Sequence, residues 1–324
     1  MPVIQPSSYR AKGIFKNQHL NTMHAVLLRK YPTVPYKRIR INTPDEDFLD
    51  LDCILQKNKR VIILLHGLEG NSKRPYMQGM AHHFMKNGWD VVSMNFRGCS
   101  GEPNLLPRSY HIGETGDLDL VVKSTLNLHP YEQVSILGFS MGGNMVLKYL
   151  GEQGNSLIPQ IKSAVAISVP VDVVKANLEI DRWYNWHYRK NLVNSLNETY
   201  RIKMERFPDK FSLPPFGWPT SFEEFDDHYT APVHGFDSAQ HYWDVNSSLH
   251  FIPDIAAPTL LINAKDDTFL SDTCYPNRLA QQHPMFHLES PDYGGHLGFV
   301  SSFPDGSYWT EKRALEFIRN QDRQ

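Results

Sequence analysis

Cysteine is scarce in this sequence, and the three cysteines, Cys53, Cys99 and Cys274, lie far apart. An odd number without close pairs argues against a disulfide framework, so we expect a reducing compartment and a cytoplasmic location. No Cys-x-x-Cys pair is present, and the adjacent His82 and His83 lack the spacing of metal ligands. The sequence therefore predicts no metal site.

Charge of one sign and long apolar runs are lacking as well. The 33 lysines and arginines against 35 aspartates and glutamates give a net charge of −2, which leaves no basic footprint for nucleic acid. The segment Met1–Pro6 has neither the basic start nor the apolar core of a signal peptide. No apolar run approaches the roughly 20 residues that span a bilayer. We expect no nucleic-acid partner and no transmembrane segment, while contact with a membrane surface stays open. Nothing in the sequence specifies an oligomeric state.

What the chain of 324 residues does contain is a regular alternation of apolar runs and helical patterns. Alternating residues in Lys37–Asn42 and Phe48–Gln56, with a polar turn between them, predict a β-hairpin. Further strands are expected at Val61–Leu65, Trp89–Phe96, Gln133–Phe139, Ile161–Val169, Pro258–Ala264 and Met285–Glu289, and helices at Ser72–Lys86, Gly113–Leu128, Met141–Glu152, Ser271–Gln282 and Ser307–Asn320. This spacing indicates right-handed βαβ units. The sequence predicts an α/β fold in one domain, residues 1–324, with a mainly parallel central sheet and helices on both faces.

Residues 1–35 are expected to form an N-terminal arm and a helix. The arm, residues 1–17, reads as irregular. The apolar residues of the helix Asn17–Lys30 share one face: Leu20, Met23, Val26 and Leu27. Packing on the core is the favoured interpretation of this face, and a membrane-surface anchor is the alternative.

Residues 173–250 interrupt the strand–helix alternation, because they contain no buried strand pattern. Asn191–Arg206 looks helical, and proline and aromatic residues are frequent. Four of the six tryptophans lie here: Trp183, Trp186, Trp218 and Trp243. A helical, aromatic insertion after a strand favours a lid over the strand ends, where ligands bind in open α/β sheets. A packing subdomain without a role in binding is the alternative.

The clearest chemical motif is Gly138-Phe139-Ser140-Met141-Gly142, between a predicted strand and a predicted helix. A serine on such a turn is held in a strained conformation with its hydroxyl exposed above the sheet. Gly138 and Gly142 are expected where a Cβ would collide with neighbouring backbone, and Gly143 is expected to add slack. The context makes Ser140 the predicted nucleophile rather than a chance match.

A serine nucleophile needs a histidine base and a carboxylate that orients it, and on this architecture the chain order is serine, acid, histidine. Asp267 follows the predicted strand Pro258–Ala264 and is the favoured acid. Asp266 is the alternative, and either could simply cap a helix. The glycine-flanked His296 is the predicted base. His283 and His287 are disfavoured because they lie at a helix end and within a strand.

An oxyanion hole requires two backbone N–H groups aimed at the developing negative charge. One is expected from Met141, directly after the nucleophile. The other is expected from Leu68 in His66-Gly67-Leu68-Glu69-Gly70, the loop after a buried strand. His66 is assigned to support of that loop and not to proton transfer. Arg97 and residues 110–115 are expected to order loops around the pocket or to have no function.

With these motifs in view, the chain resembles the YheT branch of the α/β-hydrolase superfamily. The resemblance rests on the serine motif, on His66–Gly70, on Asn95–Gly101, and on two segments that hold the predicted acid and base, Asn263–Asp267 and Gly295–Gly298. It covers nearly the whole chain, including the lid stretch Phe225–Pro232, whereas His241-Tyr242-Trp243 departs from the family pattern. The branch contains predicted esterases in bacteria. Its eukaryotic relatives include phospholipase-like proteins and medium-chain acyl ester hydrolases or acyltransferases. The resemblance implies a charge-relay system of Ser140, Asp267 and His296.

The expected activity is hydrolysis of carboxylic esters through an acyl-enzyme, without a cofactor or metal. The expected substrate is a small-molecule ester, with acyl lipids included. The alternatives are an acyltransferase that passes the acyl group to an alcohol or lipid, and a phospholipase or thioesterase. A non-catalytic scaffold is disfavoured because a nucleophile, an acid and a base are all present in the required order.

Overall fold

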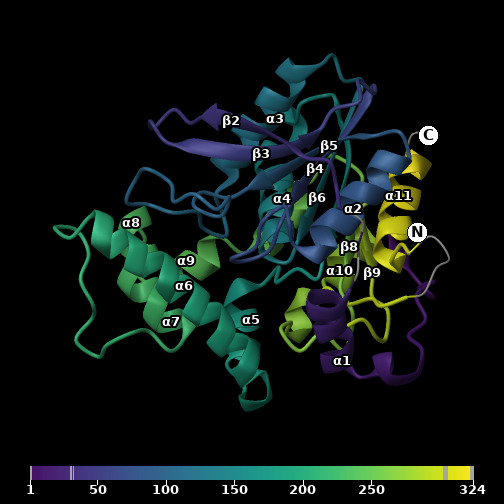
Figure 1. Ribbon diagram of the computed structural model, residues 1–324. Helices are drawn as coiled ribbons and strands as arrows, with labels where there is room; N and C mark the ends of the chain where they lie inside the picture. The colour runs from purple at the N-terminus through teal and green to yellow at the C-terminus, as the bar shows by residue number, and fades with distance from the viewer. Residues whose placement is uncertain (1, 30, 32, 302–305, 322–324) are drawn as a thin grey trace.

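The protein is built on one nine-stranded sheet with the order β1-β9-β8-β7-β6-β4-β5-β3-β2. The computed structural model describes residues 2–29, 31, 33–301 and 306–321 (Figure 1). The strands are β1 (Val3–Ile4), β2 (Lys37–Asn42), β3 (Phe48–Ile54), β4 (Arg60–Leu65), β5 (Asp90–Asn95), β6 (Gln133–Phe139), β7 (Ile161–Ile167), β8 (Thr259–Ile262) and β9 (Phe286–Glu289). Every pair from β1 through β9, β8, β7, β6 and β4 to β5 is parallel. The predicted mainly parallel sheet is confirmed.

The predicted hairpin is also confirmed, and it forms one edge of the sheet. β2 and β3 pair in antiparallel register from Lys37 with Cys53 to Asn42 with Phe48. β3 in turn pairs antiparallel with β5, so the two antiparallel strands extend a parallel sheet. A sheet edge that ends in a short antiparallel hairpin is common in mixed sheets.

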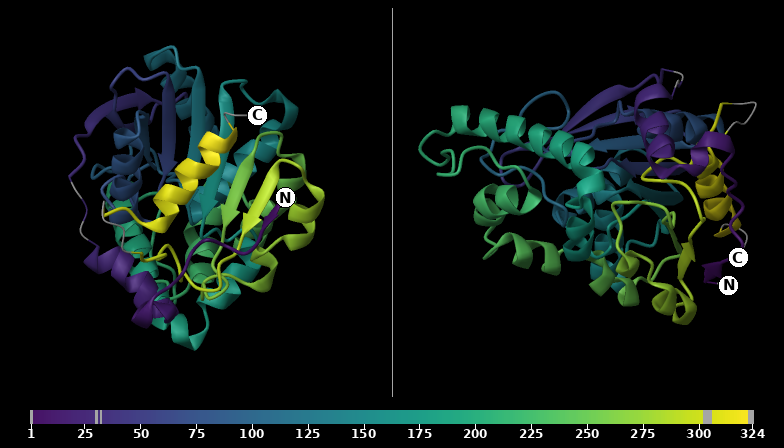
Figure 2. Two further views of the ribbon diagram at one scale, coloured as in Figure 1. Left: turned by 90° about the vertical axis from the view of Figure 1, so that its right-hand side faces the viewer. Right: turned by 90° about the horizontal axis from the view of Figure 1, so that it is seen from below.

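Helices cover both faces of the sheet because the buried strands are apolar on both sides. Along β4, Ile62 and Leu64 belong to one apolar cluster, and Ile63 and Leu65 belong to the other. The first cluster is completed by α2 (Pro75–Lys86) and α11 (Trp309–Gln321), which lie together on one face (Figure 2). The second is completed by α3 (Thr115–Leu128), α4 (Met141–Gln153) and α10 (Asn277–Gln282). The predicted two-sided α/β layering is confirmed.

The insertion at residues 173–250 is mainly helical and contains an irregular segment at 207–221. It contains α5 (Val173–Ile180), α6 (Trp186–Arg206), α7 (Phe222–Phe225), α8 (Ala231–His234) and α9 (Ala239–Val245). A π-helical turn, η5 (Asp226–Thr230), joins α7 to α8. These helices project together to one side of the sheet (Figure 1). None of the helices that the structure describes is both long enough and apolar enough to cross a membrane.

The N-terminal segment differs from the prediction in two ways. Residues 3–4 are not irregular: they form β1, which pairs with β9 through Val3 and Leu288, and Figure 2 shows this segment reaching the sheet edge. The helix is split into α1 (Gln18–Met23) and a π-helical turn, η2 (His24–Leu28). Lys30 and the side chains of Val26 and Leu27 lie outside the described part of the chain.

The face of α1 that is turned inward is polar, so the prediction that the apolar face packs on the core is wrong for Leu20 and Met23. Asn21 and Thr22 are buried, whereas Leu20 and Met23 are each 46% exposed. The buried polar side chains hydrogen-bond to loop backbone far along the chain. Helical periodicity identified the apolar residues that share one face of the helix. Hydrogen bonds to distant loop backbone decided that the opposite, polar face turns inward.

The helix predicted at Ser271–Gln282 is also interrupted. A short 3-10 turn, η8 (Asp272–Cys274), comes first, and α10 begins only at Asn277. Pro276 lies between them and cannot donate a backbone hydrogen bond to a continuing helix.

Candidate active site

Ser140 lies at a sharp turn between β6 and α4. Its backbone has φ 52° and ψ −120°, a conformation that L side chains rarely adopt. A Cβ on Gly138 would lie 2.3 Å from the Gly142 oxygen, and a Cβ on Gly142 would lie 2.4 Å from the His66 oxygen. Glycine is therefore required at both positions, as predicted. Gly143 is not slack, however, because a Cβ there would lie 2.3 Å from the Val169 side chain.

The structure brings Ser140, His296 and Asp267 into one hydrogen-bonded chain. His296 Nε2 lies 3.0 Å from Ser140 Oγ, and His296 Nδ1 lies 2.8 Å from Asp267 Oδ2. An ionised carboxylate only accepts, so Nδ1 carries the proton and Nε2 is free to accept from the serine hydroxyl. The Asp267 side chain is fully buried, which keeps water from competing for this hydrogen bond.

Asp266 and Asp267 occupy different surroundings. Asp266 Oδ1 accepts from the Gly295 N–H at 2.8 Å and has no contact with the His296 ring. Burial raises the pKa of Asp266 to about 6. Asp267 Oδ1 accepts from the Phe269 N–H at 3.0 Å while its other oxygen meets His296. Asp266 therefore supports the histidine loop, and Asp267 contacts the imidazole.

The loop after β4 lies against Ser140. A Cβ on Gly67 would be only 3.3 Å from the Ser140 Cβ. In the part of the chain that the structure describes, the Leu68 N–H has no hydrogen-bond acceptor, and the Met141 N–H lies in the first turn of α4, where no intrahelical acceptor exists. Two backbone donors are thus free beside the serine.

His66 supports this loop, as predicted. Its Nε2 accepts from the Phe96 N–H at 3.1 Å, and its Nδ1 lies 2.7 Å from the Gly67 oxygen. Burial lowers the pKa of His66 to about 3, so the ring is neutral at physiological pH. A neutral ring that donates through Nδ1 and accepts through Nε2 is a structural brace.

Glu69 ties the same loop to the helical insertion, which the sequence reasoning did not foresee. Its backbone has φ 51°, and its carboxylate accepts from Tyr110 Oη at 2.6 Å and from Thr199 Oγ1 of α6 at 3.0 Å. Tyr110 Oη accepts in turn from the Glu69 N–H at 2.9 Å. Burial raises the pKa of Glu69. The loop conformation therefore depends on a contact with the insertion.

Helix α1 holds the histidine loop from the other side. Thr22 Oγ1 accepts from the His296 N–H at 2.9 Å, and Asn21 Oδ1 accepts from the Val300 N–H at 3.0 Å. The His296 ring also stacks on Phe269 at 4.3 Å with an interplanar angle of 22°. Nothing in the local sequence marked Thr22 or Phe269, because their partners lie far away in the chain. Glu69, by contrast, lies within the glycine-rich motif His66–Gly70, which could have marked it as a residue of the site.

A pocket of about 820 Å³ opens onto Ser140 and His296. At one end, lining residues are solvent-exposed: Met23, Arg74, His187 and Asn191. At the other end the lining is buried and largely aromatic: Phe222, Phe225, Tyr229, Tyr242 and Trp243. The volume lies in the range of small-molecule sites. The pocket therefore has an open mouth near α1 and α6 and a closed, apolar end within the insertion.

Arg97 is almost completely buried and joins the β2–β3 turn to α3. It binds Asp117 of α3 through two hydrogen bonds of 2.7 Å and also pairs with Asp45 and Asp47 of the β2–β3 turn. Arg97 thus orders its neighbours through hydrogen bonds, but none of its partners lines the pocket. The segment 110–115 also orders its surroundings, since the Ile112 N–H donates to Tyr242 Oη at 2.9 Å.

Replacing Arg97 by methionine is expected to lower the free energy of unfolding by about 3 to 5 kcal/mol, because Asp47 and Asp117 would stay buried without their partner. Urea denaturation followed by circular dichroism measures this loss. Arg201→Met is the matched control, since Arg201 pairs with exposed Glu198 and Glu205 on the surface of α6 and such pairs contribute little. Equal stabilities of the two variants would contradict the role of Arg97.

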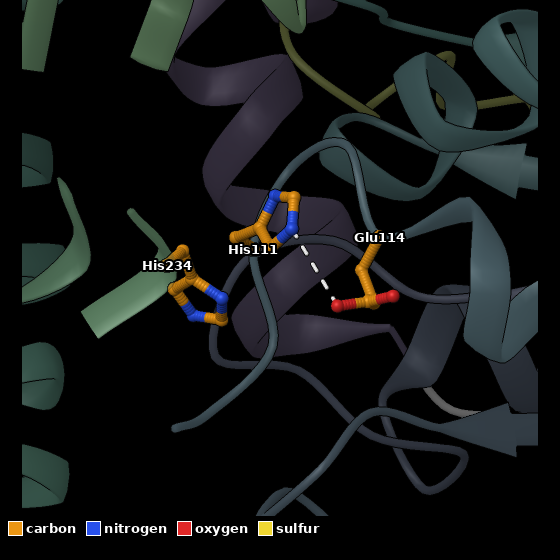
Figure 3. A group of neighbouring side chains, drawn as sticks. All are labelled: His111, Glu114 and His234. Atoms are coloured by element: carbon orange, nitrogen blue, oxygen red, sulfur yellow. Dashed lines mark ion pairs between the residues drawn. The ribbon is translucent and has the colours of Figure 1, made fainter. Parts of the chain in front are cut away.

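His111, Glu114 and His234 form a cluster whose nitrogen and oxygen atoms lie within 4.8 Å of one another (Figure 3). His111 Nδ1 accepts from the Gly113 N–H at 3.2 Å, so Nε2 carries the proton that faces Glu114 at 3.5 Å. Arg108 Nη1 binds the same carboxylate oxygen at 3.0 Å. A metal would need the unprotonated Nε2 and a carboxylate without a cation on it. The donor set fits a cluster in which Arg108 neutralises Glu114 and neutral His111 donates to it, and we assign no metal to it.

The sheet order, with a strand–turn–helix at Ser140, is that of the α/β-hydrolase fold. The model of the alpha/beta hydrolase fold family matches residues 60–302, and the chain belongs to this family. Within it the chain is a YheT-type protein: it is 32% identical to the "Putative esterase YheT" of Escherichia coli (strain K12), over 94% of this chain and 91% of the relative.

Two further similarities place the chain. It is 28% identical to the mouse (Mus musculus) protein named Phospholipase ABHD3, over 98% of this chain and 79% of that protein. Among solved structures, the esterase Pf2001 of Pyrococcus furiosus superposes with a TM-score of 0.59 and 20% identity, over 90% of this chain and 96% of that one. The second similarity shows the fold alone.

Proposed function

We propose that the protein is a serine hydrolase of carboxylic esters. The observation that carries the proposal is the hydrogen-bonded chain from Ser140 through His296 to the buried Asp267. His296 removes the proton of Ser140, whose oxygen attacks the ester carbonyl, and Asp267 holds the imidazole in the required tautomer. The same His296 protonates the leaving alcohol. A water molecule, activated by His296, then releases the acid from the acyl-enzyme.

The oxyanion of each tetrahedral intermediate is held by the N–H groups of Leu68 and Met141. These donors adjoin Ser140 and have no competing acceptor among the described residues. They are backbone groups in a rigid setting, so they need no reorganisation as charge develops. His66 and Glu69 keep the Leu68 loop in place from below and from the insertion side.

The substrate is an ester with an extended apolar part, and acyl lipids are the class that fits best. The closed end of the pocket is apolar and aromatic, and its buried length lies within the insertion. Residues 173–250 act in this proposal as a lid that encloses the apolar part of the substrate and excludes water. The similarity to a protein named a phospholipase supports this class.

The test combines covalent labelling with an ester panel. A fluorophosphonate probe is expected to label the protein on the tryptic peptide that contains Ser140, because the probe reacts with an activated serine. A series of p-nitrophenyl esters of increasing acyl length is measured for turnover and for competition with the probe. The acyl length that is hydrolysed and competes best is the preferred one. Product analysis with added ethanol separates hydrolysis from acyl transfer. Absence of both labelling and turnover over the whole series would refute the proposal and favour a non-catalytic scaffold.

A further inference from the structure

The mouth of the pocket lies between α1 and the start of α6. His19 of α1 stacks on Tyr188 of α6 with ring centroids 5.8 Å apart, and its Nδ1 lies 3.2 Å from Tyr188 Oη. Both residues line the pocket. The exposed lining residues Met23 and His187 stand on the same two helices. A substrate therefore enters past these two segments, which lie at the same end of the molecule (Figure 2).

Large exposed apolar side chains lie on the segments that line this pocket. We call Leu20, Met23, Leu178, Trp183 and Trp186 the apolar rim. Trp183 is 82% exposed and Leu178 is 58% exposed. Met23 lines the pocket, and each of the other four is next in the chain to a residue that does. Isolated exposed apolar residues are ordinary, but a group around a pocket mouth marks an interaction site.

Exposed lysines lie on or beside both segments that carry the rim. The first 44 residues contain no aspartate or glutamate, although they include Lys12 and Lys16, which are exposed just before α1. On the insertion side, Lys175 and Lys190 are exposed, and the structure gives neither of them an ion pair among the residues that it describes.

The acidic groups of the α5–α6 turn do not offset this charge, because each is already paired. Glu179 pairs with Arg182 at 2.7 Å, and Asp181 pairs with Arg189 at 3.3 Å. The rim is thus aromatic and apolar with lysines at its border. That composition is typical of segments that lie at a bilayer interface, where tryptophan sits at headgroup level and lysine meets anionic lipid.

We propose that the apolar rim docks on a lipid bilayer that carries anionic lipid, with the pocket mouth facing the membrane. Docking would let an acyl ester pass from the bilayer into the pocket without crossing water, which avoids the cost of exposing its apolar chain to water. The surface is built from the N-terminal segment and the insertion together. The proposal takes up the membrane-surface interpretation for the exposed face of α1, while its polar face holds the histidine loop. The proposal goes beyond ester hydrolysis, since docking involves no chemistry.

The experiment measures vesicle binding with the Ser140→Ala protein, so that the outcome does not depend on hydrolysis. Flotation compares vesicles of phosphatidylcholine with vesicles of equal parts phosphatidylcholine and phosphatidylglycerol. Strong flotation with the mixed vesicles, weaker flotation with the neutral ones, and a decrease with added salt are expected. Adding Leu20→Ser, Trp183→Ser and Trp186→Ser is expected to weaken partitioning about 100-fold, because three interfacial anchors are lost.

A matched control carries the same kind of change elsewhere on the insertion: Leu213→Ser, Phe216→Ser and Trp218→Ser. These residues are 41%, 59% and 40% exposed, but none of them lines the pocket. The control is expected to float like the parent, and melting temperatures show that both triple variants are folded. The proposal is overturned if the parent does not float with mixed vesicles, or if the two triple variants float equally. It is also overturned if sedimentation velocity shows a dimer that the rim variant dissociates, because a second copy would then cover the rim.

Discussion

Replacing Ser140 by alanine is expected to lower kcat for ester hydrolysis by about a millionfold while KM changes little. In the proposed mechanism the side chain that forms the acyl-enzyme is lost, but the pocket and the two proposed oxyanion donors are unchanged. Alanine also removes the hydrogen bond to His296 Nε2 without adding bulk. The measurement is single-substrate kinetics on the preferred ester of the panel, with active-site titration to exclude traces of unmutated enzyme.

His296→Ala is expected to cost about as much, and the double variant is expected to lose nothing further, because the two residues act as one unit. Additive losses would mean that the serine and the histidine act independently. A Ser140→Ala enzyme that keeps kcat within about tenfold would show that the elbow serine is not the nucleophile.

Replacing Asp267 by asparagine is expected to lower kcat by about 10⁴-fold, whereas Asp266→Asn should change it only a fewfold. Asparagine at position 267 would either donate an N–H to His296 Nδ1, which favours the wrong tautomer, or accept from it through an uncharged oxygen that stabilises the imidazolium less than a carboxylate does. At position 266 the asparagine oxygen can still accept from the Gly295 N–H. The two substitutions are chemically identical and adjacent, so each is the control for the other.

The comparison is read from kcat profiles against pH on one soluble ester, with melting temperatures to verify folding. Equal losses in both variants would indicate that the pair acts through the shape of the loop. A larger loss for Asp266→Asn would reverse the assignment of the acid, since Asp266 contacts the backbone of the histidine loop while Asp267 contacts the ring.

Much of the fold could be predicted because buried parallel strands are apolar on both faces. The run Val61–Leu65 is a clear example: every residue is buried, and the strand was placed to within one residue. β1 could not be predicted in this way. It has two residues and forms only by pairing with β9, so its own composition carries almost no signal. The break at Pro276 could have been predicted, because proline interrupts helices by a local mechanism.

Some residues of the site could likewise be predicted from local sequence, whereas the choice of the acid required the fold. Ser140, Met141 and Leu68 could be proposed from the sequence because an elbow and an oxyanion loop are local structures whose glycines and strand context are visible in a few residues. The preference for Asp267 over Asp266 rested only on its place farther out on the turn after the strand. Only the folded loop shows that one carboxylate reaches the imidazole and the other reaches the backbone of Gly295.

The sequence by itself determined the mainly parallel α/β architecture, the strained serine turn and the chain order of Ser140, Asp267 and His296, the proposed nucleophile, acid and base. The architecture and the turn follow from periodicity and local backbone sterics. Tertiary structure alone decided that Thr22 holds His296, that Glu69 joins the oxyanion loop to α6, and that α1 turns its polar face inward. The physical reason is that a hydrogen bond between residues distant in the chain forms only where folding brings a donor and an acceptor together. The sequence around the donor does not indicate its acceptor, and the sequence around the acceptor does not indicate its donor.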